Sequence, residues 1–298
     1  MQYRKFGALF SLILLFCGCA SSAQIKLSHP RPVGFWENKE AVVQVLHFYS
    51  KLETDKTGKP ILDDKGRFTT SVAISLGTGS VVDTNGLVLT NNHIVNENCP
   101  ITVTPDIIFP PLPESCPLKT VITADQLATP LPKEIYLVCK TTDKRDCHSA
   151  KLIAEDTNND LGLLQTDTTF PRAIKFVDDS ELVPGDEVYF WGNVGMFLPP
   201  SPFFGRYVGR VGPPYFKGDI FGKYEGDLLP LLLMDIYLVS GSSGSPIFDR
   251  LGRAIGVNNS ILPSVMMGMS GARSLGITIP SHKAIEFIKK NSPKLPKK

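Results

Sequence analysis

The sequence has almost no excess of charge of either sign. Its 31 lysine and arginine residues are nearly balanced by 29 aspartate and glutamate residues, so the formal net charge is +2 over 298 residues. Nucleic-acid-binding proteins generally concentrate positive charge, and this balance therefore argues against a nucleic-acid partner. The sequence also lacks an internal repeat and a long amphipathic helical stretch, which argues against a repeat array or a helical bundle.

A long hydrophobic run is missing as well. The most apolar stretch, residues 6–16, follows the basic residues Arg4 and Lys5 and is too short for an ordinary membrane-spanning helix. Small residues follow at positions 17–23. A basic start, a short apolar core and a small-residue exit are typical of a secretory signal.

Two processing routes fit this segment. Phe16-Cys17-Gly18-Cys19 is similar to a bacterial lipobox, which favours a signal segment over residues 1–19 and a lipid on Cys19. Cleavage after Ala23 is the alternative and would give a secreted soluble form. Both routes take the protein out of the cytoplasm, and the first predicts a periplasmic protein held at a membrane by its lipid. Residues 20–37 are interpreted as a tether.

Export changes the interpretation of the cysteines. Without Cys17 and Cys19, four remain, and an even number in an exported protein suggests disulfide bonds. Three pairings are open, and the two local ones, Cys99–Cys116 and Cys139–Cys147, are preferred. A metal site is disfavoured, because neither pair has C-x-x-C spacing and no histidine pair stands nearby.

Short Val/Ile/Leu/Tyr runs separated by turn residues, with 25 glycines and 24 prolines, indicate an all-β protein. The only convincing helix comes last, after Ser281 as a plausible N-cap, with Ala284, Ile285 and Ile288 on one face. A basic tail follows at residues 291–298. Residues 96–133 contain many prolines and are interpreted as an inserted loop.

The stretch Gly241-Ser242-Ser243-Gly244-Ser245-Pro246 lies between apolar runs. A hydroxyl on a glycine-flanked turn suits a nucleophile whose neighbouring N–H groups face a developing oxyanion, although a plain turn would have the same composition. Of the five histidines, His93 ends a strand in a polar turn and is the best candidate base. Asp160 precedes an apolar strand and is the best candidate acid.

The order His93, Asp160, Ser243 and the surrounding motifs resemble the trypsin-like serine peptidases of the HtrA (Deg) type. The matching segments occur in family order across about 40–290. They are Gly77-Thr78-Gly79-Ser80-Val81-Val82, Leu89-Thr90-Asn91-Asn92-His93-Ile94-Val95, Asn159-Asp160-Leu161-Gly162-Leu163-Leu164, Pro184-Gly185-Asp186, Gly192-Asn193, Gly241-Ser242-Ser243-Gly244-Ser245-Pro246, Gly256-Val257-Asn258 and Gly276-Ile277-Thr278-Ile279-Pro280-Ser281.

The resemblance implies a fold and a division into domains. The fold is two six-stranded antiparallel β-barrels with a short C-terminal helix. The peptidase domain is expected over residues 38–290, with the first barrel at about 38–170, the second at about 171–280 and the helix at about 281–290. No segment long enough for a PDZ domain follows that helix, so the resemblance is to the protease domain alone.

The resemblance also implies roles for single residues. His93 is the base, Asp160 its orienting acid and Ser243 the nucleophile, and the N–H groups of Gly241 and Ser243 form the oxyanion hole. An extended polypeptide substrate is expected to pair with residues 258–260, namely Asn258, Asn259 and Ser260. No metal or organic cofactor is needed, and the oligomeric state stays open.

Some positions depart from the family pattern. Gly162 stands for a common alanine and Ser245 for a common glycine. Tyr237 occupies the position where enzymes that select Arg or Lys carry an acid, which predicts an apolar P1 preference. The favoured function is an exported serine endopeptidase acting through an acyl-enzyme. The alternative is an exported lipoprotein that uses the same barrels as a non-catalytic or ligand-gated binding scaffold.

Overall fold

A computed structural model of the chain describes residues 31–96, 101–102, 119–123, 134–140, 146–193, 200–211, 231–262 and 275–293. The signal segment with Cys19, residues 20–30 of the expected tether, and the cysteines Cys99 and Cys116 lie outside the described residues. The described chain belongs almost entirely to one compact unit, Pro32–Lys298.

The first barrel is a closed antiparallel ring of six strands in the order β1-β6-β7-β8-β3-β2, closed by pairing of β1 with β2. Its strands alternate between a face that fills the barrel and a face that covers it, as period-two strands do. The strands are β1 (Val42–Leu52), β2 (Phe68–Asp83), β3 (Leu87–Thr90), β6 (Ile135–Lys140), β7 (Cys147–Asp156) and β8 (Leu161–Thr166).

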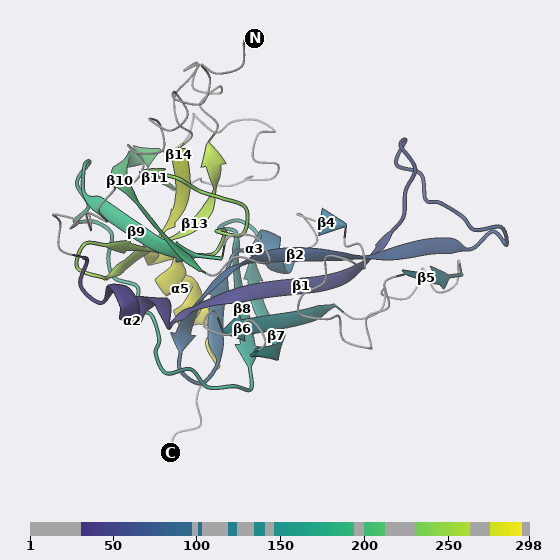
Figure 1. The fold of residues 1–298 in the computed structure, drawn as a ribbon, viewed down its shortest axis with the longest axis horizontal. Coiled ribbons are helices and arrows are strands. Elements are labelled where there is room, and N and C mark those ends of the chain that lie inside the picture. Colours follow the sequence, from purple (N-terminus) through teal and green to yellow (C-terminus); the bar gives the residue numbers. More distant parts are fainter. Residues whose placement is uncertain are drawn as a thin grey trace, which may run out of the picture. The chain divides into compact units, whose positions relative to one another are not determined.

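The second barrel is a closed ring in the order β10-β11-β14-β13-β12-β9. The predicted fold of two six-stranded antiparallel barrels is therefore confirmed (Figure 1). Here the strands are β9 (Glu187–Gly192), β10 (Ser201–Val211), β11 (Leu231–Ile236), β12 (Pro246–Asp249), β13 (Ala254–Leu262) and β14 (Leu275–Pro280).

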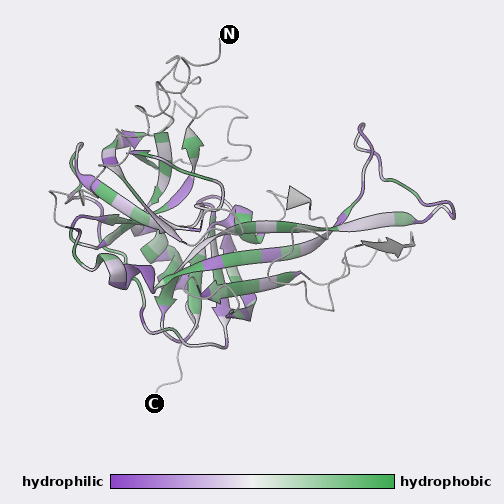
Figure 2. Cartoon of the chain, viewed as in Figure 1, coloured by the Kyte–Doolittle hydropathy of each residue, from purple (hydrophilic) through white to green (hydrophobic). Residues whose placement is uncertain are grey.

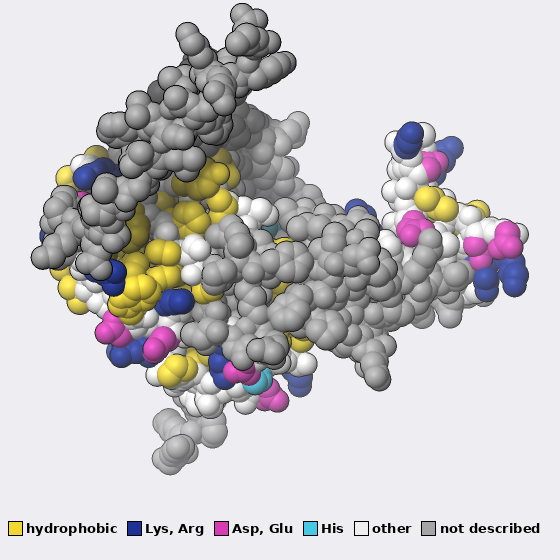
Figure 3. All heavy atoms as spheres, viewed as in Figure 1, with side chains coloured by type: hydrophobic (Ala, Val, Ile, Leu, Met, Phe, Trp, Pro, Cys, Tyr) yellow, Lys and Arg dark blue, Asp and Glu magenta, His cyan; other side chains and the backbone are white. Residues whose placement is uncertain are grey.

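Strands β1 and β2 continue beyond the first barrel as a long two-stranded ribbon (Figure 1), pairing as far as Leu52 with Thr70. Two short strands, β4 (Ile101–Thr102) and β5 (Lys119–Ile122), pair with β2 along this ribbon. Most residues of the barrel strands are hydrophobic (Figure 2). Lysine, arginine and acidic side chains gather at the tip of the ribbon (Figure 3).

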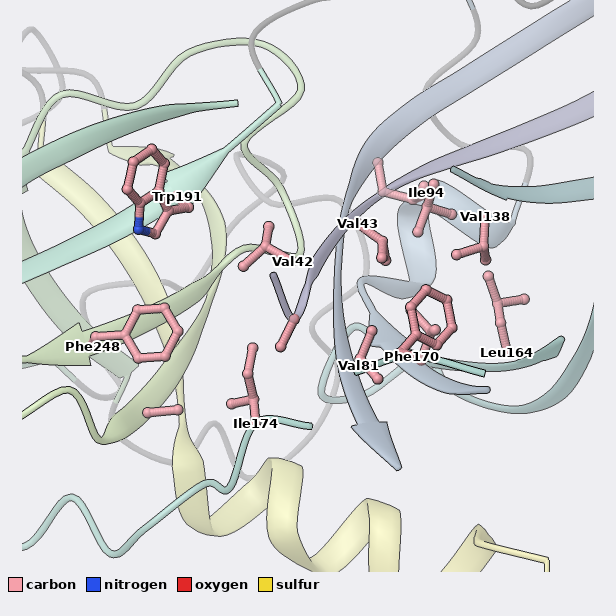
Figure 4. Close-up of a cluster of buried hydrophobic side chains, with 14 of the residues drawn as sticks. Val42, Val43, Val81, Ile94, Val138, Leu164, Phe170, Ile174, Trp191 and Phe248 are labelled. Atoms are coloured by element: carbon pink, nitrogen blue, oxygen red, sulfur yellow. The ribbon is translucent and has the colours of Figure 1, made fainter. Parts of the chain in front are cut away.

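Buried apolar side chains join the two barrels. One cluster combines Val43 and Val81 of the first barrel with Trp191 and Phe248 of the second (Figure 4). Ile174, in the segment that connects the barrels, belongs to the same cluster. Because these buried side chains form one apolar cluster, the barrels are packed as one body, and burial of this apolar surface is the main force that holds them together.

The folded unit begins earlier than the expected domain boundary at residue 38. A short helix, α2 (Phe35–Lys39), places the Phe35 ring against Trp191, with ring centroids 4.7 Å apart, and leaves Phe35 only 4% exposed. The Trp191 indole N–H donates to the Phe35 carbonyl at 2.9 Å. Aromatic burial therefore draws residues 32–37, which were expected to be tether, into the fold.

The C-terminal helix α5 (Ser281–Asn291) covers the junction of the barrels. Its Ala284 and Phe287 pack with Leu163 of β8 and Val257 of β13. Ser281 is not its N-cap, which is a correction. The cap position is Pro280, and the Ser281 hydroxyl instead donates to the buried Asp179 carboxylate at 2.8 Å.

Asp179 supplies the cap from outside the helix. Its carboxylate accepts the His282 backbone N–H at 3.4 Å, which satisfies one of the donors that a helix start leaves open. It also pairs with Arg210 of β10 at 2.5 Å. One buried acid in the connecting segment thus ties the second barrel to α5.

The expected Cys139–Cys147 disulfide is present and joins opposite residues of the β6–β7 hairpin. Such a cross-link restricts the unfolded chain more than the folded one. No helix among the described residues has both the length and the apolar character needed to cross a bilayer.

Candidate active site

His93 sits on a one-turn helix, α3 (Asn92–Val95), directly after β3. Ile94 and Val95 are buried in the first barrel, and this anchors the turn and leaves the His93 side chain at the surface of the site, 21% exposed. The buried Asn91 side chain donates to the Asp160 carbonyl at 3.0 Å. The polar residues before His93 therefore bind the segment that carries the acid.

Asp160 follows a tight turn and precedes β8. Its backbone has a φ of 51°, a left-handed conformation that is uncommon for a residue other than glycine and that neighbouring contacts must maintain. Two hydrogen bonds hold its carbonyl oxygen, from the Asn91 side chain and from the Asn92 N–H at 3.1 Å. The strained backbone is thus locked where the carboxylate meets His93.

Asp160 is 6% exposed, and both of its carboxylate oxygens accept hydrogen bonds. Oδ1 accepts the His93 backbone N–H at 2.8 Å, and Oδ2 contacts His93 Nδ1 at 2.7 Å. The Asn259 amide donates to Oδ2 at 2.9 Å. A proton on Nδ1 satisfies the carboxylate, and this tautomer leaves Nε2 with the lone pair that a general base requires.

Ser243 lies on the turn before β12, between Gly241 and Gly244, both with positive φ. Gly244 must be glycine, because a Cβ there would lie 2.0 Å from the Thr78 carbonyl oxygen. The Ser243 hydroxyl donates to the Asn259 carbonyl at 3.1 Å. In this conformation the hydroxyl is therefore engaged by β13 and not by His93, although the structure brings the three residues to one site.

Two N–H groups of this turn are unused in the described part of the chain. Those of Ser242, Gly244 and Ser245 donate to carbonyl oxygens at 2.9 to 3.0 Å, whereas those of Gly241 and Ser243 have no acceptor among the described residues. Adjacent unpaired donors beside a hydroxyl have the chemistry of an anion site. They are the two donors that the sequence predicted for an oxyanion hole.

Thr78 supports this turn from the other barrel. Its hydroxyl, fully buried, donates to the Gly241 carbonyl at 2.7 Å and accepts the Asn193 backbone N–H at 3.0 Å. The Thr78 N–H donates to the Ser243 carbonyl at 2.8 Å. These bonds anchor the carbonyl groups of Gly241 and Ser243 and so hold the turn that carries the two unused N–H groups.

Sequence reasoning quoted Gly77-Thr78-Gly79 as a motif and gave Thr78 no role. The feature of the sequence that could have pointed to Thr78 was its position as a polar residue between two glycines on a strand. Gly77 is needed because a Cβ there would lie 2.8 Å from Ile94 and 3.0 Å from the Ser243 carbonyl oxygen. The motif therefore lets the first barrel approach the nucleophile turn of the second.

The expected substrate-binding residues are not equivalent. Tyr237 is 74% exposed, so its ring does not form the base of a buried subsite. Asn258 is fully buried, and its backbone is already paired with Ser245 and Gly244 on one side and with β14 on the other. The edge that an extended peptide can use therefore begins after Asn258.

Asn259 and Ser260 lie at that edge. The pairing with β14 shifts between Asn258 and Ser260, so Asn259 is an extra residue in the strand, a β-bulge. The bulge turns its side chain toward Asp160. Asn259 therefore contacts both the acid, through its amide, and the nucleophile, through its carbonyl.

Metal-binding chemistry finds no support in the described residues, where no group of three or more His, Cys, Asp or Glu side chains is arranged around a common point. The site as described consists of an imidazole–carboxylate pair, a hydroxyl and two unpaired N–H groups. Such a set fits acyl transfer.

Comparison with known proteins agrees with this chemistry. The model of the trypsin-like peptidase domain matches residues 77–257. Two proteins named probable periplasmic serine endoprotease DegP-like are similar. The one from Marinomonas sp. is 25% identical over 214 residues and the one from Rickettsia conorii is 27% identical over 229 residues. These matches cover 72% and 74% of this chain but 35% of each relative, so the chain spans about a third of their length.

Among solved structures, the HtrA-type protease AlgW with a tripeptide has a TM-score of 0.54 and 18% sequence identity over 86% of this chain and 62% of that one. At that identity the match supports the fold alone. The family model, by contrast, matches more than half of the chain. The chain therefore belongs to the family of trypsin-like peptidase domains.

Proposed function

We propose that this protein is a serine endopeptidase of the HtrA type that cleaves peptide bonds with His93, Asp160 and Ser243. The contact that carries the proposal is the 2.7 Å pair between His93 Nδ1 and the buried Asp160 carboxylate, located beside a serine turn with two unused N–H groups. Each part has a function in acyl transfer.

In this mechanism the Ser243 hydroxyl leaves the Asn259 carbonyl and turns to His93. Nε2 takes its proton while Oγ attacks the scissile carbonyl, and Asp160 stabilises the imidazolium that forms. The N–H groups of Gly241 and Ser243 bind the oxyanion. Transfer of the proton from His93 to the leaving amine gives an acyl-enzyme, which water hydrolyses by the same route in reverse.

The substrate is proposed to be an extended polypeptide. Relatives of this chain are named serine endoproteases, and the similar AlgW structures contain a tripeptide and a decapeptide. The pairing of β12 with β13 ends at Pro246 opposite Val257, and the peptide is proposed to extend β13 from there along Asn259 and Ser260 through main-chain hydrogen bonds. The apolar P1 preference expected from the sequence stays a prediction.

The proposed location is the periplasm, as the names of the DegP-like relatives state for those proteins. A lipid on Cys19 would hold the protein at a membrane, and cleavage after Ala23 would release it. Fractionation of cells that express the wild type and Cys19→Ala separates the two routes. An anchored wild type with a released variant supports lipidation, and a soluble wild type excludes it.

A second function is favoured by one observation, the hydrogen bond from Ser243 to Asn259. If that bond persists in every state, the barrels are a binding scaffold and not an enzyme. A ligand-gated scaffold would release it only when peptide occupies the edge of β13.

Reaction of Ser243 with a fluorophosphonate tests the proposal. We expect labelling of the wild type and none of Ser243→Ala. Ser242→Ala is the matched control, because the Ser242 hydroxyl donates to the Val239 carbonyl at 2.7 Å and takes no part in the chemistry, so this variant should still react. A wild type that stays unlabelled with and without added peptides would show that the barrels only bind.

A further inference from the structure

A layer of polar side chains lies fully buried behind the nucleophile turn. It consists of Ser245, Asn258 and Thr278, each 0% exposed, and is called the polar layer below. In the described part of the chain, the Ser245 and Thr278 hydroxyl oxygens and both amide atoms of Asn258 have no hydrogen-bond partner. Native proteins satisfy most buried polar groups, so several unsatisfied groups in one place need an explanation.

The three residues are neighbours on adjacent segments. Asn258 of β13 lies directly opposite Thr278 of β14. The Asn258 N–H donates to the Ser245 carbonyl at 2.8 Å, which places Ser245 on the other side of Asn258. Side chains of directly opposed residues share one face of a sheet, so the amide of Asn258 and the hydroxyl of Thr278 point the same way.

That face is the interior of the second barrel. A Cβ at Gly192 would lie 3.3 Å from the Ser245 hydroxyl oxygen and 2.7 Å from Phe190, a residue of the barrel core. Gly276, two residues before Thr278 and on the same face, is similarly close to Leu238 of that core, at 3.1 Å from a Cβ. The polar layer therefore closes an otherwise apolar core at the end nearest Ser243.

The proposed acylation brings a substrate side chain to this end of the barrel. Attack joins Ser243 Oγ to the carbonyl carbon of the P1 residue, and the P1 Cβ is then three bonds from Oγ, about 4 Å or less away. Ser245 is two residues beyond the nucleophile. The P1 side chain is thus the part of a substrate that comes nearest to the polar layer, which is fully buried in this structure and must open to admit it.

We propose that Ser245, Asn258 and Thr278 line the P1 subsite and select neutral P1 side chains that both donate and accept hydrogen bonds, such as threonine and asparagine. This inference rests on the proposed endopeptidase function. An apolar P1 side chain of the same shape would leave the buried hydroxyls and amide unpaired. A site built to hydrogen-bond its substrate discriminates strongly against an analogue that cannot.

The inference differs from the apolar preference expected from Tyr237. That expectation placed residue 237 at the base of the subsite, whereas the Tyr237 ring is exposed and lies 6.4 Å from that of Phe203 between centroids. The polar layer is buried at the end of the barrel instead. It contains no charged group, which agrees with a neutral P1 residue and not with arginine or lysine.

Isosteric peptide pairs test the inference. Peptides that differ only in threonine or valine at P1, and a second pair with asparagine or leucine, have nearly equal shape and differ in hydrogen bonding. We expect kcat/KM of the wild type to be about tenfold higher for the polar member of each pair, which corresponds to one net hydrogen bond. Thr278→Val should reduce that ratio several-fold, and Thr278→Ser, which keeps the hydroxyl, should preserve it.

Ser245→Ala removes a second hydroxyl from a different segment and provides the test if Thr278→Val does not fold, which thermal melting will show. Equal or faster cleavage of the valine and leucine peptides would overturn the inference. So would a wild-type preference that none of the variants changes, because the layer would then only hold internal water. Fluorophosphonate labelling of Ser243 does not depend on P1, so a labelled enzyme without the preference refutes this inference alone. An unlabelled protein that cleaves neither pair refutes the proposed function with it.

Discussion

Removing the Thr78 hydroxyl is expected to damage both stability and catalysis. In Thr78→Val the side chain keeps its shape, but the Gly241 carbonyl and the Asn193 N–H lose their partner in a fully buried position. Each orphaned group costs about 1–3 kcal/mol, so we expect a loss of roughly 2–6 kcal/mol in the free energy of unfolding. For a domain of this size that corresponds to a fall of about 5–20 °C in Tm.

The effect on catalysis has a different origin. Without the hydroxyl, the Gly241 carbonyl loses its anchor, and we expect the turn to shift so that the N–H groups of Gly241 and Ser243 no longer converge on the proposed oxyanion position. Loss of one such donor lowers kcat by about 10²–10³. KM should change little, because the edge of β13 that binds the peptide main chain is untouched.

Steady-state cleavage of one peptide, with thermal and denaturant unfolding of the same samples, measures both effects. Thr78→Ser is the matched control, because it keeps the hydroxyl and loses only a methyl group. The reasoning is refuted by a folded Thr78→Val enzyme with wild-type kcat. It is also refuted by a Thr78→Ser enzyme that is as impaired as Thr78→Val.

Three further outcomes are expected from other parts of the fold. Burial lowers the pKa of His47, in β1, to about 4. As the pH falls, the unfolded chain therefore binds a proton on this histidine before the folded chain does. In denaturant titrations, wild-type stability should fall by roughly 3 kcal/mol between pH 6.5 and 4, and that of His47→Phe should change less. Burial raises the pKa of the Asp179 carboxyl, but bonds from Ser281, His282 and Arg210 outweigh it and leave the pKa below its ordinary value. Asp179→Asn should therefore lower the free energy of unfolding by about 2–3 kcal/mol near pH 7. As the pH falls below about 4 and the wild-type carboxylate takes up a proton, the difference in stability between wild type and variant should shrink. A difference that persists at low pH would contradict this assignment. Cys147→Ser should cost about 2–3 kcal/mol in urea unfolding, and reducing agent should destabilise the wild type by a similar amount but leave that variant unchanged.

The elements of the site that depend on short motifs were predictable. Asp160 precedes an apolar strand and His93 follows one, and these neighbouring residues identified them as candidates. In the structure the two side chains are in direct contact. The all-β character followed from the spacing of strands and turns, and the two barrels followed from the family resemblance. These features are local in the chain, so one sequence contains most of the information that specifies them.

The contacts that join distant segments were not predictable in the same way. Thr78 and Gly241 are 163 positions apart, and no local sequence pattern predicts their hydrogen bond. The side-chain direction of Asn259 depends on a β-bulge, which inserts a residue into the strand and reverses the alternation from that point. The docking of Phe35 likewise depends on an aromatic pocket that exists only after the second barrel has formed.

The dependence of the nucleophile turn on Thr78 has a consequence for timing during biogenesis. Thr78 leaves the ribosome 163 residues before Gly241, and the strand that pairs with Asn258 follows later still. A chain caught part-way has no anchored Gly241 carbonyl and no Asp160–Asn259 bond. The proposed peptidase site is therefore assembled only after β13 and β14 have been synthesised, so we expect a partly synthesised chain to be inactive.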